Sequence, residues 1–139
     1  MVQLIVGKKG KGKTKCLLEK VNSEVKSILG DVVFLDKNTS HMYELNNKVR
    51  LIVVPDFMID TEEEFVGFIA GIISQDHDLQ QVYVDSFLNV SGIGEGGILP
   101  IIEKLEKFSD NFHIDFILSI SMDETELPES VRKNVVTSL

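Results

Sequence analysis

The feature that most constrains the fold is a segment rich in glycine and lysine near the amino terminus, residues 7–14, Gly-Lys-Lys-Gly-Lys-Gly-Lys-Thr. The apolar run Val2–Val6 directly precedes it and predicts a buried strand. Residues 13–28 follow with apolar side chains at helical spacing, and Gly30 lies where a helix is expected to stop. Strand, glycine loop and helix in this order predict one unit of an α/β fold.

The remaining chain continues this alternation. Apolar runs predict strands at residues 32–35, 82–87 and 114–120, and a hairpin of residues 42–45 and 49–54 that turns at Asn46 and Asn47. Helices are predicted from an Asp60 cap with Glu63 at its third position, over residues 98–108, and briefly from Pro128 to near Lys133. We therefore predict a three-layer α/β sandwich with a mainly parallel central sheet, locally antiparallel at the hairpin, in a single domain over residues 1–139.

Charge is distributed unevenly along the chain. Residues 1–26 hold seven lysines and two glutamates, a net +5, whereas residues 27–139 hold seven basic and twenty acidic side chains, a net −13. A cationic focus on an acidic body attracts a compact polyanion and repels a long phosphate backbone. The distribution favours a nucleotide ligand and argues against DNA or RNA.

The composition also bears on location and on structural metal. No apolar run approaches the roughly 20 residues that span a bilayer, and the first residues lack the apolar core of a signal peptide. One cysteine, Cys16, cannot form an internal disulfide, and no Cys/His spacing suits zinc. We expect a soluble cytoplasmic protein without a structural metal, in which Cys16 packs as a small residue.

The glycine loop matches the pattern G-x-x-x-x-G-K-[ST] at every fixed position, between a predicted strand and a predicted helix. Glycines let backbone N–H groups approach phosphate oxygens, and the helix start adds partial positive charge. Lys13 is expected to reach the β- and γ-phosphates and the Thr14 hydroxyl to ligate Mg²⁺. The predicted nucleoside triphosphate site comprises Gly7, Gly10, Lys11, Gly12, Lys13, Thr14 and Lys15.

A second motif accompanies the glycine loop. Residues 82–85, Val-Tyr-Val-Asp, resemble the Walker B strand of P-loop NTPases, and with residues 7–14 they make the chain similar to the additional-strand, RecA-like branch of that superfamily and to small uncharacterised bacterial ATP-binding proteins. The resemblance implies a P-loop NTPase fold, ATP and Mg²⁺ as cofactors, and a role for Asp85 in holding the magnesium through water. Lys13 and Asp85 are then the expected catalytic residues.

The sequence departs from that family beside Asp85. Many such ATPases have a Glu directly after the Walker B Asp, but this chain has Ser86, which predicts slow hydrolysis. Asp36 and Asp56, at other strand ends, are alternative acids, and each could instead cap a turn. Ser119 and Ser121 are candidates for a hydroxyl near the γ-phosphate.

Two further patterns resemble nucleotide-binding motifs but do not fit them. Residues 92–97 match G-x-G-x-x-G but are separated from the preceding strand, so we expect a mobile loop that acts as a lid or partner loop. Residues 47–50 begin like the guanine-binding N-K-x-D, but Arg50 replaces the Asp. GTP specificity therefore has no support.

Three functions remain open. The first is a slow or partner-activated ATPase or nucleotide switch, completed by a protein partner or a second copy of the chain. A small-molecule kinase is less favoured, because Arg50 and Arg132 are the chain's only arginines to clamp a transferring phosphoryl group. The third is a non-catalytic module that binds ATP as a ligand or signal.

Overall fold

The structure, a computed structural model, describes residues 1–93 and 97–139. Within these residues six strands form one sheet in the order β3-β2-β4-β5-β1-β6, and every neighbouring pair that the structure describes is parallel. The strands are β1 (Val2–Val6), β2 (Asp31–Asp36), β3 (Val49–Val53), β4 (Leu79–Val84), β5 (Asp115–Ile120) and β6 (Val135–Ser138).

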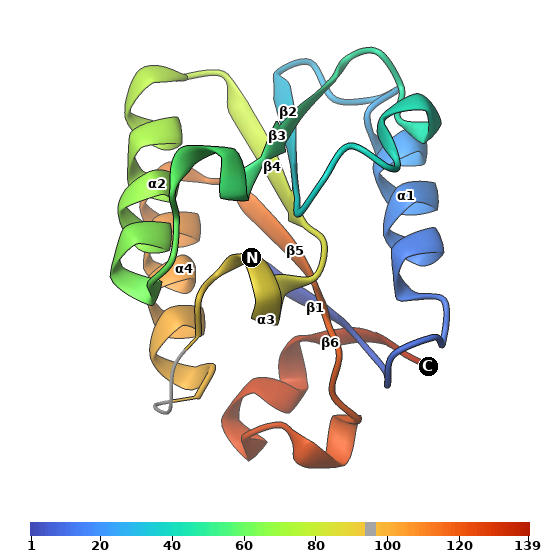
Figure 1. The fold of residues 1–139 in the computed structure, drawn as a ribbon. Coiled ribbons are helices and arrows are strands. Elements are labelled where there is room, and N and C mark those ends of the chain that lie inside the picture. The colour runs from blue at the N-terminus through green and yellow to red at the C-terminus, as the bar shows by residue number, and fades with distance from the viewer. Residues whose placement is uncertain (94–96) are drawn as a thin grey trace.

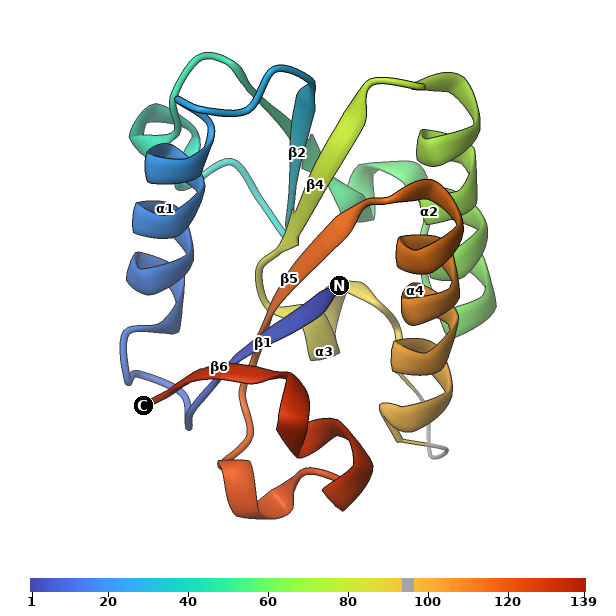
Figure 2. The ribbon, with the colours of Figure 1, turned by 180° about the vertical axis from the view of Figure 1, so that it is seen from behind.

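Helices cover both faces of the sheet (Figures 1 and 2). Helix α1 (Lys13–Glu24) lies on one face, and α2 (Glu62–Gln75) and α4 (Leu99–Phe112) lie on the other. One further α-helical turn and four short 3-10 helices complete the described elements: α3 (Phe87–Val90), η1 (Met42–Glu44), η2 (Val54–Phe57), η3 (Glu124–Glu126) and η4 (Glu129–Asn134). The predicted three-layer α/β sandwich with a mainly parallel sheet is confirmed.

Alternation along the strands divides the core in two. Side chains of one parity, such as Leu4 and Val6, pack with α2 and α4, whereas Ile5 packs with α1. The central strands have apolar residues at both parities, as expected for a parallel sheet covered on two faces.

The predicted hairpin is wrong. Residues 42–44 form the 3-10 turn η1, and β3 pairs with β2 in parallel. Asn22 of α1 holds the connection in place: its Nδ2 donates to the Glu44 carbonyl at 2.7 Å, and its Oδ1 accepts from the Asn46 N–H at 2.8 Å. The asparagines therefore mark a turn that leads back to the sheet edge, not a hairpin turn.

Several predicted boundaries also differ. Helix α1 ends at Glu24, where the Ser27 N–H and hydroxyl both bond to the Glu24 carbonyl. The cap of α2 is Thr61, in a capping box with Glu64, and not Asp60 with Glu63. The strand predicted over residues 82–87 is β4, which ends at Val84, so Phe87 already belongs to α3. The predicted terminal helix is the 3-10 helix η4, and the sequence did not predict β6.

Parallel pairing brings several strand ends to one edge of the sheet. Val6 lies opposite Ile120, and Val84 lies opposite both Leu35 and Leu118. The residues that follow β1, β2, β4 and β5 therefore meet at this carboxyl edge, which is where ligands bind in open α/β sheets. Of the predicted lid at residues 92–97, residues 94–96 lie outside the described part of the chain.

Candidate functional site

Residues 7–12 connect the carboxyl end of β1 to the start of α1. Gly10 and Gly12 have φ angles of 85° and 96°, which residues with a side chain rarely adopt. Gly12 is the N-cap of α1 and has no side chain to bond the first turn, so the N–H groups of Lys13 and Thr14 point out of the helix start without an intrahelical acceptor. The Gly7 N–H donates to the Met122 carbonyl at 2.9 Å and fixes the loop to the chain beyond β5.

Lys13 lies folded over this loop. Its side chain is 7% exposed, and its Nζ donates to the Lys8 carbonyl at 3.0 Å. Burial lowers the pKa of Lys13, and the nearby charge of Asp85 partly opposes that shift. An ammonium group held on a loop carbonyl can move to an anion that enters the loop.

The other lysines of the segment differ in position. Lys9, Lys11 and Lys15 are exposed, and Lys8 forms an exposed ion pair with Glu126 at 2.7 Å. Lys15 also lines a cavity of about 420 Å³ beside α1. Cys16 is half-buried and packs against the core beneath α1, as expected for a small apolar residue.

Thr14 and Asp85 meet although 70 residues separate them in the chain. The Thr14 hydroxyl lies 3.0 and 3.2 Å from the two Asp85 carboxylate oxygens. Ser119 of β5 donates to Asp85 Oδ1 at 2.6 Å and accepts from the Ser86 N–H at 2.9 Å. Asp85 is 3% exposed, so these contacts hold its carboxylate in one orientation toward the helix start.

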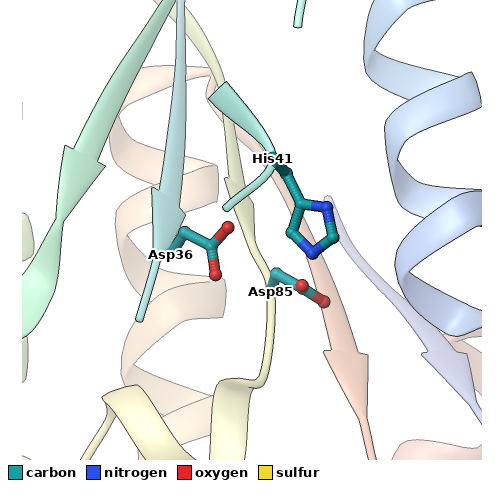
Figure 3. Close-up of side chains that lie close together, drawn as sticks. All are labelled: Asp36, His41 and Asp85. Atoms are coloured by element: carbon teal, nitrogen blue, oxygen red, sulfur yellow. The ribbon is translucent and has the colours of Figure 1, made fainter. Parts of the chain in front are cut away.

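The structure distinguishes between the alternative residues. Ser119 contacts Asp85, whereas Ser121 is exposed. Asp36, at the end of β2, is buried in a group with Asp85 and His41, and Asp56 is exposed in η2. Figure 3 shows Asp36, His41 and Asp85 converging at the carboxyl edge. The sequence did not single out His41; its position five residues after the end of β2 is the only signal that could have found it.

Asp36 occupies an unusual environment. It is 1% exposed, its Oδ1 accepts from the Lys37 N–H at 2.7 Å, and its Oδ2 has no hydrogen-bond partner in the described chain. Burial raises the pKa of Asp36; the Lys37 hydrogen bond opposes that shift and the Asp85 charge adds to it.

Both arginines are engaged elsewhere. Arg50 pairs with Asp31 and Asp76, and Arg132 donates to the carbonyls of Leu127 and Thr125. Asp31 begins β2, so Arg50 lies at the amino edge of the sheet, opposite the site. Neither arginine is therefore positioned at the site by these contacts.

No helix in the described residues is long and apolar enough to cross a membrane.

Comparison with known proteins supports the fold alone. No protein-family model matches the chain, and no curated protein matches it. The crystal structure of flagellar accessory protein FlaH from Methanocaldococcus jannaschii is similar, with a TM-score of 0.62 and 13% sequence identity over 95% of this chain. The chain spans 65% of the length of that FlaH chain. It thus has an α/β fold with a parallel sheet of the kind found in FlaH.

Proposed function

We propose that the chain binds ATP with Mg²⁺ at the carboxyl edge of the sheet and acts as a slow or partner-activated ATPase or nucleotide switch. The contact between the Thr14 hydroxyl and the Asp85 carboxylate carries this proposal. It brings the end of the glycine loop and the end of the acidic strand to one point, as joint magnesium binding requires.

The residues of the site fit a nucleoside triphosphate. The start of α1 offers free N–H groups and partial positive charge for phosphate oxygens, and Lys13 offers a mobile ammonium group. Thr14 and Asp85 offer oxygen atoms, the ligands that Mg²⁺ prefers. Thr14 and Asp85 would hold Mg²⁺, which would offset the negative charge of the phosphate groups.

Sheet order adds support. Strand β5 lies between β1, which leads into the glycine loop, and β4, which directly precedes Asp85. One strand inserted between the two motif strands agrees with the resemblance to the additional-strand branch of P-loop NTPases. The proposal that the bound nucleotide carries adenine, and is therefore ATP, rests on that resemblance.

Slow hydrolysis follows from what surrounds Asp85. The residue after Asp85 is Ser86, which has no carboxylate to orient water. Its N–H donates to the Ser119 hydroxyl, and its φ is 53°. Asp36 is the better placed of the two alternative acids, and its raised pKa moves it toward the range of a general base. A second copy or a protein partner would have to supply an arginine.

Calorimetry of ATP binding with and without Mg²⁺ tests the proposal. Lys13→Ala should weaken the affinity for ATP by about tenfold or more, because it removes a charge-assisted contact worth roughly 1.5 to 3 kcal/mol. Lys9→Ala is the matched control, since it removes an exposed lysine of the same loop and should change affinity far less. Asp85→Asn should abolish the Mg²⁺ dependence. Equal ATP affinity in the parent protein and Lys13→Ala would reject the site.

A further inference from the structure

Three potential metal ligands converge beside the proposed nucleotide site. One carboxylate oxygen each of Asp36 and Asp85 and one ring nitrogen of His41 lie within 4.8 Å of one another. They come from the ends of two adjacent strands, β2 and β4, and from the segment that follows β2 (Figure 3). Small movements of Asp36 and His41 toward the fixed Asp85 carboxylate would close this spacing onto one ion.

Asp36 gives independent reason to expect a ligand here. Its Oδ2 is buried without any hydrogen-bond partner in the described chain, while Oδ1 already holds the Lys37 N–H. A buried carboxylate oxygen without a partner is costly, and a cation would offset that cost. The second carboxylate, Asp85, is also buried, so two negative charges share a space that no described ion pair neutralises.

His41 is oriented as a metal ligand. Its Nδ1 lies 2.7 Å from Glu44 Oε2, and because a carboxylate can only accept, this nitrogen carries the proton. In the neutral ring Nε2 is then the free acceptor, and Figure 3 shows one ring nitrogen directed toward Asp85. A carboxylate that fixes the outer nitrogen of a ligating histidine is a recurring arrangement in metal sites.

The site is open to ions from solvent. His41 and Glu44 line the same cavity of about 420 Å³ as Thr14, and the His41 side chain is 32% exposed. An ion in this cavity therefore reaches the imidazole first, and the two buried carboxylates lie behind it.

We propose that Asp36, His41 and Asp85 form a second cation site that binds a divalent transition metal of the Zn²⁺, Co²⁺ or Mn²⁺ class without nucleotide. Imidazole binds these ions and discriminates against Mg²⁺, which prefers oxygen ligands throughout. Glu44 is a positioning residue, since it acts through His41. The site shares Asp85 with the proposed magnesium site but uses His41 in place of Thr14, so it goes beyond the proposed function and does not depend on ATP binding.

Titration of the nucleotide-free protein with Co²⁺, followed by visible absorption, tests the proposal. One equivalent should bind, and a hundredfold excess of Mg²⁺ should not displace it. His41→Ala and Asp36→Asn should each weaken the affinity for Co²⁺ by at least about tenfold, and Glu44→Gln should weaken it by a smaller factor. His77→Ala, which removes an exposed histidine far along the chain, is the matched control and should leave the affinity unchanged.

Folding and ATP binding separate this proposal from the first. His41→Ala should keep the parent circular dichroism and its affinity for ATP with Mg²⁺, which shows that only the second site is lost. Unchanged Co²⁺ affinity in His41→Ala, displacement by Mg²⁺, or Co²⁺ binding that requires ATP would each overturn the second site. Failure of the parent protein to bind ATP would overturn only the proposed function.

Discussion

Asp36 is the residue whose environment carries the clearest energetic consequence. Burial raises its pKa, so its ionisation opposes folding at every pH above the pKa of the unfolded chain, near about 4. The cost grows as pH rises from that value to the folded pKa and is absent below it. Asn has nearly the same shape and can still accept the Lys37 N–H.

We therefore predict that Asp36→Asn stabilises the metal-free protein. Removal of the buried charge should raise the free energy of unfolding at pH 7 by about 1 kcal/mol, and the gain should shrink as pH falls toward about 4. Urea unfolding with a chelator present, at both pH values, measures this. A variant less stable than the parent at pH 7 would show that Asp36 has a stabilising cationic partner in the free protein.

At the residue scale, the sequence indicated the site residues that belong to local motifs. It missed His41, whose position at the site depends on the fold. Lys13 and Thr14 belong to one contiguous motif, and Asp85 follows an apolar run, so pattern alone indicated them. His41 lies at the site because the chain beyond β2 turns toward α1, where Asn22 binds the Glu44 carbonyl. No periodicity in residues 37–48 encodes that path.

At the scale of elements, α1 connects the glycine loop to the rest of the sheet. Its last residue, Glu24, accepts from the Tyr83 hydroxyl at 2.6 Å and from Gln81 Nε2 at 3.0 Å, both on β4. Burial alone would raise the pKa of Glu24, but these hydrogen bonds and the charge of Lys20 lower it overall. Strand β4, which directly precedes Asp85, thus holds the far end of the helix that starts at Lys13.

Tyr83→Phe should loosen this connection. We expect the free energy of unfolding to fall by about 1 kcal/mol at pH 7. Because the folded pKa of Glu24 is depressed, its contribution is present above the unfolded pKa, near about 4.3, and is lost as pH falls through the folded pKa, so the deficit should shrink in acid. Chemical unfolding against pH checks this, with Tyr43→Phe, an exposed tyrosine, as control. An equal deficit at all pH values would contradict it.

Elements with strong periodicity were predictable, and the connections were not. Strands β1, β4 and β5 are buried on both faces and read as apolar runs. The hairpin failed because Asn46 and Asn47 signal a turn without specifying the direction of the strand that follows; the contacts of Asn22 with residues 44 and 46 decide it. Strand β6 is short and half exposed, so its sequence shows no buried pattern.

At the scale of the whole molecule, the proposed nucleotide site has few groups that could drive phosphoryl transfer. Both arginines are bonded elsewhere, and the position after Asp85 is a serine. Phosphoryl transfer depends on positioned water and on neutralised charge, and this chain by itself offers mainly Lys13 and the helix start. Activity at ordinary rates would need groups from another molecule.

We accordingly predict that the isolated protein hydrolyses ATP well below the roughly 1 to 10³ s⁻¹ typical of enzymes. Steady-state phosphate release, measured over a wide range of protein concentration, checks the rate, and Lys13→Ala corrects for contaminating phosphatases. A rate per molecule that rises with concentration would indicate that a second copy completes the site. Fast turnover independent of concentration would contradict the prediction, because the site would then be complete within one chain. Asp36 would become the leading catalytic acid, since Asp56 is exposed in η2 and lies outside the group of residues that meets Asp85.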